Sequence, residues 1–473
     1  MSDEAEAIWA GTSDLKAAIS NVAAAGDPGA QPVEAATTYF DVLAPYFGVF
    51  FVAWAVTIVS TPLMRMIAVR FGLVDWPDLK RKNHVEPVAY LGGAAIFLGW
   101  LSGVLVCWFV SPHNSARSAF TQVQFPPSII AGATLIMIAG LIDDIWSISP
   151  RVKIAWQLFA AGLLAYNDMG IKLMQDVLGA TGIPDPALIG PITMSYVLGA
   201  MVIAIFVIGA CNAVNLLDGL DGLVAGSLSI SFFAFLVIAC YAALALTDPG
   251  AEASLSDHLN DPIRIIMCMA VLGALLGFLP HNFNPANIFM GDAGSLLLGY
   301  LSATTILLFA HSMKQGPLLV TAALIVFALP ITDTALAIFR RVMSNQSIFA
   351  GDNEHLHHHL VRGFAGMGCG PLLSIKLTVV SMYILSLIFA VLGFVLVFVR
   401  WRLGIAVFAV IFGFVAVVAY KAGHRRAYLI KSSSARPDRP EAATGPTPRG
   451  SLVGGSQPQP PQTAVSKAHS TPS

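Results

Sequence analysis

The stretch Phe278–Gly299, FLPHNFNPANIFMGDAGSLLLG, joins two long apolar runs through a polar turn. Within the turn a single carboxylate, Asp292, lies between Gly291 and Gly294. Glycine allows sharp bends and lets backbone N–H groups approach a ligand. The stretch therefore predicts one of two things: a site for a metal ion and a phosphate at the membrane edge, or only the cap of an interfacial helix.

The composition is typical of a polytopic membrane protein. Of the 473 residues 56% are hydrophobic and 11% are charged, whereas soluble domains average about 25% charged residues. The net charge of -1 gives no indication of nucleic-acid binding. The five cysteines form neither a disulfide framework nor a zinc-binding pattern.

A membrane span needs about 20 apolar residues, a criterion that predicts an all-α fold with about 11 transmembrane helices. We expect a soluble flexible leader at 1–40, a transmembrane domain at 41–431 and a disordered Pro/Ser-rich tail at 432–473. The expected spans are 43–66, 91–111, 127–146, 152–167, 193–214, 222–246, 263–281, 294–313, 317–341, 373–399 and 402–420.

Basic residues in short loops indicate the cytoplasmic side. They follow the first, third and ninth expected spans, whereas the loop at 247–262 is acidic and has no Lys or Arg. Arg400 and Arg402 oppose this orientation. The majority predicts a multi-pass membrane protein whose odd-numbered spans and C-terminus end in the cytoplasm.

Five polar clusters fall on this predicted cytoplasmic face, as expected for one shared active site. They are Lys80–His84, Asp143 with Asp144, Asn212–Asp221, Asn282–Asp292 and Asp352–His359. Unrelated interfacial caps would be divided between the two faces.

Asp143 and Asp144 are adjacent in LIDDIWSISPRVKIAWQ. Neighbouring helical residues point about 100° apart, so we expect one carboxylate to face the reaction centre and the other to anchor a loop or a second ligand. Lys153, with Gln157 four residues later, can share a face with this pair. The alternative is that both acids cap a helix end.

Asn212, Asn215, Asp218 and Asp221 recur every three residues in CNAVNLLDGLDGLVAG. This spacing keeps them near one side of a helix, and polar groups at the end of an apolar helix are costly unless paired or hydrated. Such amides and carboxylates suit the hydrogen-bonding edge of a nucleobase or ribose.

The histidine loop follows Arg340 and Arg341 and carries Asp352, His355, His357, His358 and His359. A transition-metal site and a phosphate site both fit these residue types. Asp333, two turns before Arg340, is interpreted mainly as an internal partner for a cation or polar neighbour, with a direct catalytic role as the alternative.

The basic loop 80–84 includes Lys82 and His84, which either anchor the loop on the positive side or bind an anionic lipid head or diphosphate. Flexible backbone, acids for a divalent cation, basic groups for phosphate and amides for a base or sugar together indicate phosphoryl transfer at the membrane surface.

Five segments resemble, in order, the motifs of the polyprenyl-phosphate N-acetylhexosamine-1-phosphate transferases. They are RKNHVEPVAYLGGAAIF, GLIDDIWSISPRVKIAWQ, NAVNLLDGLDGLVAG, FNPANIFMGDAGSLLLGY and SIFAGDNEHLHHHL. The resemblance covers about residues 80 to 370. The HLHH form is most similar to the branch that uses UDP-GlcNAc and undecaprenyl phosphate.

The resemblance implies transfer of a sugar 1-phosphate from a UDP-sugar to a lipid phosphate, with release of UMP. By analogy Asp292 and Asp143 would hold Mg²⁺ (Mn²⁺ is an alternative), and Asp143, Asp144, Asp292 and His355 would be catalytic. The substrate-binding residues would be Lys82, His84, Lys153, Asn212, Asn215, Asp218, Asp221, Asn287, Arg341, His357 and His358. Expected partners are the polyprenyl phosphate, the UDP-sugar and the lipid bilayer, with no nucleic acid; a homodimer remains open.

Two departures lie in the histidine loop, where the branches of the family differ. Ile348 stands where proline is usual and Asn353 where arginine is usual, so another UDP-hexosamine or UDP-MurNAc-pentapeptide stays an alternative donor. The lipid phosphate is mostly dianionic at pH 7 because its second pKa is about 6, so it gains little from a base. A single in-line displacement is expected, with a two-step route through an aspartyl phosphate as the alternative. A membrane transporter is the rival class.

Overall fold

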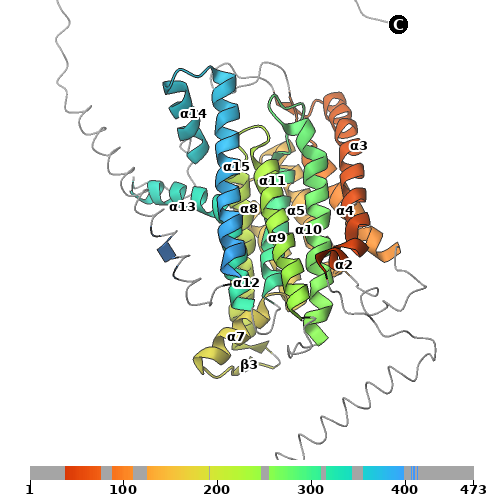
Figure 1. Cartoon of the computed structure of the whole chain (residues 1–473), viewed down its shortest axis with the longest axis vertical. Helices are drawn as coiled ribbons and strands as arrows, with labels where there is room; N and C mark the ends of the chain where they lie inside the picture. The colour runs from red at the N-terminus through yellow and green to blue at the C-terminus, as the bar shows by residue number, and fades with distance from the viewer. Residues whose placement is uncertain are drawn as a thin grey trace, which may run out of the picture. The chain divides into compact units, whose positions relative to one another are not determined.

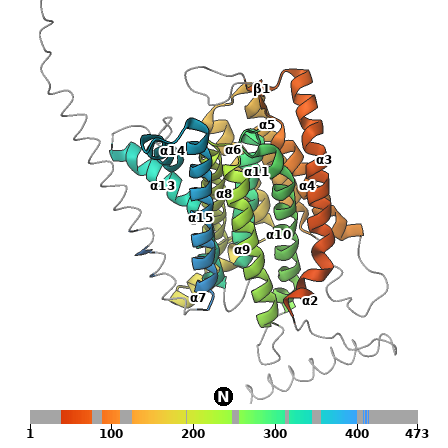
Figure 2. The same ribbon diagram turned by 45° about the horizontal axis from the view of Figure 1, so that its top comes forward.

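Seven helices in the described part of the chain are long and apolar enough to cross a membrane, or eight if one bent pair counts as a span. They run side by side within one compact unit of the chain, Met1–His424 (Figures 1 and 2). The structure is a computed structural model that describes residues 38–75, 88–109, 125–190, 192–246, 255–310, 316–343 and 355–398, with positions 406, 409, 410 and 413. The tail, nearly all of the expected leader and most of the expected last span lie outside these residues.

The chain is an all-α integral membrane protein with two short two-stranded sheets. Its elements are α2 (Tyr39–Leu43), η1 (Ala44–Tyr46), α3 (Phe47–Phe71), β1 (Val74–Asp75), β2 (Val88–Ala89), α4 (Gly92–Phe109), α5 (Pro127–Trp146), α6 (Pro150–Tyr166), α7 (Ile171–Thr181), β3 (Ala187–Ile189), β4 (Ile192–Thr193), α8 (Met194–Leu217), α9 (Leu223–Leu246), α10 (Leu255–Asn282), α11 (Gly291–Phe309), α12 (Gly316–Val326), α13 (Ala328–Met343), α14 (Leu356–Gly366) and α15 (Pro371–Leu396).

The expected ninth span, 317–341, is not one straight helix. It breaks at Phe327 into α12 and α13, whose axes differ by 69°. Pro330 lies in the first turn of α13, where a missing N–H removes no helical hydrogen bond. The proline therefore starts a second helix, and this is the local signal that the sequence-based prediction overlooked.

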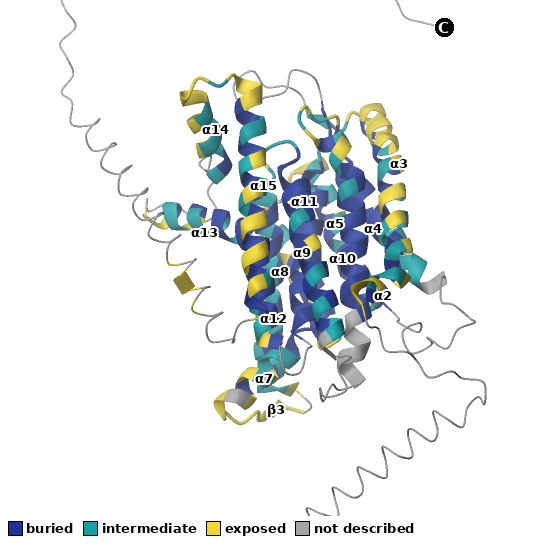
Figure 3. Cartoon of the chain, viewed as in Figure 1, coloured by how far each residue is buried: buried dark blue, intermediate teal, exposed yellow. Residues whose placement is uncertain are grey.

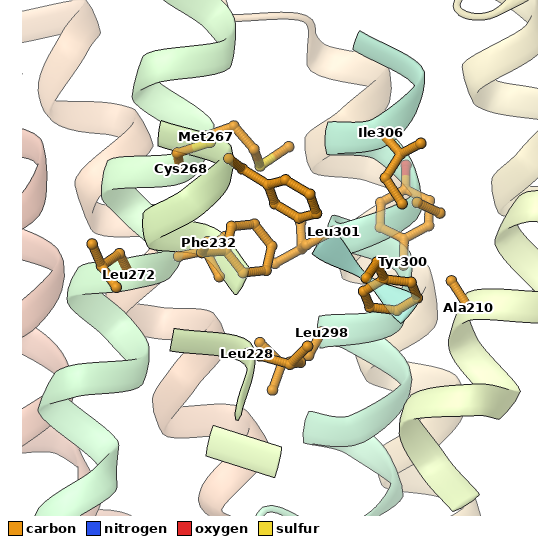
Figure 4. Packing of buried hydrophobic residues seen from close by; sticks show 14 of the residues in the cluster. Ala210, Leu228, Phe232, Met267, Cys268, Leu272, Leu298, Tyr300, Leu301 and Ile306 are labelled. Carbon is orange, nitrogen blue, oxygen red and sulfur yellow. The ribbon is translucent and has the colours of Figure 1, made fainter. Parts of the chain in front are cut away.

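Helix α11 is the centre of the bundle. It packs against α4, α5, α8, α10 and α12, and every residue from Ala293 to Phe309 is buried. A helix that is apolar nearly all round is stable in such a position, and Figure 3 colours most of α11 as buried. Figure 4 shows its Leu298 and Leu301 among side chains of α9 and α10, including Phe232 and Met267.

Backbones approach α11 closely because small residues line its neighbours. A Cβ built on Gly140 of α5 would lie 2.5 Å from the Cα of Ala293, and one on Gly299 of α11 would lie 2.5 Å from the Cα of Cys211 of α8. Membrane helices commonly pack through such small residues. Contacts at Gly140 thus fix the first turn of α11, which carries Asp292.

The loop before α11 is also tied to the loop before α4. The N–H of Phe289 donates to the carbonyl of Ala89 at 2.8 Å, and the N–H of Gly92 donates to the carbonyl of Phe289 at 3.0 Å. Ala89 pairs in turn with Val74 across the β1–β2 hairpin. The polar turn of Phe278–Gly299 is therefore held at Phe289 by two backbone hydrogen bonds to the segment before α4.

We expect Gly140→Ala to destabilise the protein by about 1 to 3 kcal/mol, because the added methyl group overlaps the backbone of Ala293. The matched control is Gly162→Ala in α6, where an added Cβ meets nothing within 4 Å; it should be neutral or stabilising by up to about 1 kcal/mol. Thermal unfolding of the purified protein in detergent measures both. Equal melting temperatures for the two variants would contradict the packing argument.

Candidate active site

The site is built at the corner between α5 and α6. Asp143 and Asp144 lie in the last turn of α5, and Ser147 then turns the chain with a positive φ of 50° before α6 begins at Pro150. Oδ1 of Asp143 accepts a hydrogen bond from the N–H of Ile148 at 2.8 Å. One oxygen of Asp143 therefore holds the corner, and Oδ2 forms an ion pair with Lys153 Nζ.

Asp144 caps the start of α11. Its Oδ1 accepts from the N–H of Asp292 at 2.7 Å and its Oδ2 from the N–H of Ala293 at 3.0 Å. Gly291 has φ +66°, and a Cβ there would lie 2.5 Å from Asp144 Oδ2. The two adjacent acids thus serve different partners, as their helical spacing predicts.

Asp292 is not the cap of its own helix, so its side chain faces the site. Oδ2 lies 2.6 Å from Lys153 Nζ, which also pairs with Asp143. Oδ1 accepts from the Asn215 side-chain amide at 2.8 Å, and the same Nδ2 donates to Ser295 Oγ at 3.0 Å. The two carboxylates, Asp143 and Asp292, therefore converge on one cationic group.

Asn212 faces a different neighbour from Asn215. Its Nδ2 donates to Gln157 Oε1 at 3.1 Å and to the carbonyl of Ile208 at 2.7 Å. Asn212 thereby ties α8 to α6 beside the site. Of the Lys153 and Gln157 pair, only Lys153 bonds the carboxylates.

Asp221 joins two polar turns. Its Oδ2 accepts from Asn284 Nδ2 at 2.9 Å and from the N–H of Ala286 at 3.0 Å. Asn287 lies in this second turn, exposed, with its backbone N–H donating to the carbonyl of His281 at 2.9 Å. One Asp221 oxygen thus fixes the loop that leads to α11.

Asp218 lies just after α8, between the carboxylates of Asp143, Asp144 and Asp292 on one side and the histidines of α14 on the other. Burial, followed by the charges of Asp292, Asp144 and Asp221, raises the pKa of Asp218 from 3.8 to about 8. A large share of this carboxyl is therefore protonated at neutral pH, when it can donate a hydrogen bond as well as accept one.

His355 lies at the start of α14, and His357, His358 and His359 lie within the helix. His355 Nδ1 donates to Asp333 Oδ2 at 2.9 Å, and His357 is fully buried against Gly219 of the turn that follows Asp218. Burial, followed by the neighbouring His358, lowers the pKa of His357 to about 3, and burial also lowers the pKa of His358. His357 is therefore neutral at pH 7.

The structure brings most of the expected site residues to one end of the bundle. Asp143, Asp144, Lys153, Asn215 and Asp292 form one bonded group. Asp218 and its turn connect this group to His357, while Asn212 and Asp221 support its edges and Arg341 is buried on α13. Lys82 and His84 lie outside the described residues.

Tyr90 was not singled out from the sequence. It lies between β2 and α4 with its ring 6.0 Å from that of Phe289. Burial raises the pKa of its hydroxyl, and so do the Asp75 carboxylate bonded to it and the nearby Asp144 and Asp292. The available signal was a hydroxyl-bearing aromatic residue in an apolar stretch beside the basic loop.

Comparison with known proteins identifies the family. The sequence model of glycosyl transferase family 4 matches residues 126–310, which run from the start of α5 through α11 and include the bonded group. A protein of Bacillus subtilis (strain 168), named a probable undecaprenyl-phosphate N-acetylglucosaminyl 1-phosphate transferase, is 31% identical over 79% of this chain and 91% of its own length. The chain belongs to glycosyl transferase family 4. This confirms the resemblance carried by the five motifs.

Other family members differ in the lipid that their names specify. A decaprenyl-phosphate N-acetylglucosaminephosphotransferase of Mycolicibacterium smegmatis is 32% identical over 65% of this chain and 73% of its own. An undecaprenyl-phosphate alpha-N-acetylglucosaminyl 1-phosphate transferase of Escherichia coli (strain K12) is 27% identical over 63% of this chain and 71% of its own. The names of all three relatives specify a polyprenyl phosphate and N-acetylglucosamine.

Asp218 makes stability depend on pH. Its pKa in the folded protein, about 8, exceeds the ordinary value of 3.8. The contribution of Asp218 to the free energy of unfolding is therefore complete below pH 3.8 and is lost as the pH rises through about 8. As the pH rises from about 5 to about 9, we expect the melting temperature of Asp218→Asn to fall less than that of the wild type. Thermal unfolding across this range measures the difference, and parallel profiles would contradict the assignment.

Proposed function

We propose that the chain transfers N-acetylglucosamine 1-phosphate from UDP-GlcNAc to a polyprenyl phosphate, undecaprenyl phosphate in the first instance. The products are UMP and a polyprenyl-diphosphate-GlcNAc, the first lipid-linked sugar of a cell-envelope glycan. The names of the relatives support this reaction. The observation that carries it is the convergence of Asp143 and Asp292 on one cation, beside polar turns suited to a nucleotide.

The residues at this point fit Mg²⁺. Within the described residues no group of three or more His, Cys, Asp or Glu side chains could hold a metal ion, but Mg²⁺ is usually held by one or two carboxylates together with substrate phosphates and water. Asp143 and Asp292 would hold it, and Mn²⁺ accepts the same oxygen ligands. When bound, the ion offsets the repulsion between the two phosphate-bearing substrates.

The chain's own residues supply orientation and charge. The hydrogen bond from the Asn215 side-chain amide fixes the rotamer of Asp292, and Lys153 places a positive charge between the carboxylates of Asp143 and Asp292. Neutral His357 can donate one hydrogen bond to a phosphate oxygen. These groups position two anions rather than react covalently with either.

The proposed chemistry is a single in-line displacement. An oxygen of the lipid phosphate attacks the phosphorus attached to the sugar, the bond from this phosphorus to the bridging oxygen breaks, and UMP leaves with that oxygen. The acceptor needs little help from a base because it is mostly dianionic at neutral pH. We place the reaction at the cytoplasmic face of a bacterial inner membrane, where the basic loops are expected to lie.

The purified protein should release UMP from UDP-GlcNAc only when Mg²⁺ and a polyprenyl phosphate are both present. Chromatography of the nucleotide products measures this release, and omission of either component is the control. A panel of UDP-sugars, including UDP-MurNAc-pentapeptide, identifies the donor. A protein that releases no UMP from any of them would instead fit the transporter class.

Asp292→Asn should reduce turnover to below about a tenth of the wild-type rate, since loss of a metal-held charge in the transition state costs several kcal/mol. The amide still occupies the same volume, so the variant should insert and unfold at a similar temperature. Activity of the variant above this limit would rule out Asp292 as a metal ligand.

A further inference from the structure

Asp333 is a buried carboxylate that uses both of its oxygens to hold a different helix. It lies on α13 with 0% exposure. Oδ2 accepts from His355 Nδ1 at 2.9 Å, and Oδ1 accepts from the N–H of Leu356 at 2.8 Å. A buried charge is costly unless it is paired and hydrogen bonded, so this pair of bonds is what permits an acid at this position.

The two bonds set both the position and the chemistry of the start of α14. His355 is the N-cap residue of α14 and makes no side-chain capping bond of its own. Asp333 therefore does from another helix what a capping side chain usually does. Because the carboxylate accepts at Nδ1, that ring nitrogen of His355 carries a proton.

The effect of Asp333 extends to the histidine that faces the polar turn. The rings of His355 and His357 are stacked, with centroids 5.6 Å apart and planes 4° from parallel. His357 is fully buried and packs on Gly219, and neither of its ring nitrogens has a hydrogen-bond partner among the described residues. Most buried polar atoms in proteins have a hydrogen-bond partner, so these two ring nitrogens are open to water, an ion or a substrate group.

Helices α13 and α14 both pack against α15. Helix α13 also packs against α8. Figure 2 shows α13 and α14 beside each other at the edge of the bundle. The bonds of Asp333 thus join the inclined half of the bent pair to the helix that carries the histidines.

We propose that Asp333 is a positioning residue for the donor site: by fixing His355 and the first turn of α14, it presents His357 to the diphosphate of the UDP-sugar beside Gly219. The assignment rests on the proposed transferase function. Asp333 itself contacts no substrate. Its removal should displace the histidines from the donor while leaving the carboxylate group at Asp292 unchanged.

The test compares Michaelis constants for the two substrates. Asp333→Leu should raise KM for UDP-GlcNAc by at least about tenfold and change KM for the polyprenyl phosphate by less than about twofold, since uniform loss of folded protein alters neither constant. Asp333→Asn keeps an acceptor for Leu356 and should lie between this variant and the wild type. The matched control is Thr332→Val, which removes a buried bond to the carbonyl of Leu329 within the same helix and should leave both constants unchanged.

A second measurement does not depend on the enzymatic activity. The melting temperature lost by Asp333→Leu and by His355→Leu should be less than additive in the double variant, because both changes break the same bond. Additive losses, or an unchanged KM for UDP-GlcNAc in Asp333→Leu and Asp333→Asn, would overturn the proposal. If the wild type transfers no sugar phosphate, the proposed function fails, and the thermal cycle alone decides whether Asp333 holds His355.

Discussion

The two hydrogen bonds from the start of α11 to Asp144 are the contact on which the site depends. Helix α11 is enclosed by its neighbours, and its first N–H groups would be unsatisfied without an acceptor. Asp144 supplies that acceptor from α5. The side chain of Asp292 is thereby released from capping its own helix and faces Lys153 and Asn215 instead.

Charge balance follows from this arrangement. Asp143, Asp144, Asp218 and Asp292 are held within one small region at the end of an apolar bundle, where acids repel one another strongly. The structure meets this repulsion in three ways: Lys153 pairs with two of the acids, backbone N–H groups bond a third, and the raised pKa of Asp218 lets the fourth keep its proton. A bound divalent cation and anionic substrates would change all three together.

The sequence was sufficient for the class of fold, the family and the gathering of those polar residues that the structure describes, because each is expressed locally. Apolar runs of membrane length predict helices, and the motif around Asp292 is rich in glycine and amides that have no place in a buried helix unless they serve a site. The bend at Phe327 was not predicted because the apolar pattern continues through the break. The two short sheets were not predicted because strands of two or three residues show no periodicity. Helical geometry predicted that Asp143 and Asp144 face different partners. Which of the two caps α11 and which pairs with Lys153 depends on contacts between residues 148 positions apart in the chain. Asp333 was recognised as an internal partner, whereas its bond to His355 requires the relative placement of α13 and α14.

The crowding of backbone around α11 also sets where this protein can acquire a new substrate preference. Positions such as Gly140 and Gly299 have no space for even one extra carbon, so the interior is closed to gradual exploration by mutation. The exposed turn at Asn287 and the segment after α14, where a Cβ on Gly366 or Gly370 would meet nothing within 4 Å, are outside this constraint. Substitutions that change substrate preference are therefore expected in the exposed segments at the end of the bundle. Directed evolution of the sugar specificity should mutagenise those segments and leave the helical interior unchanged.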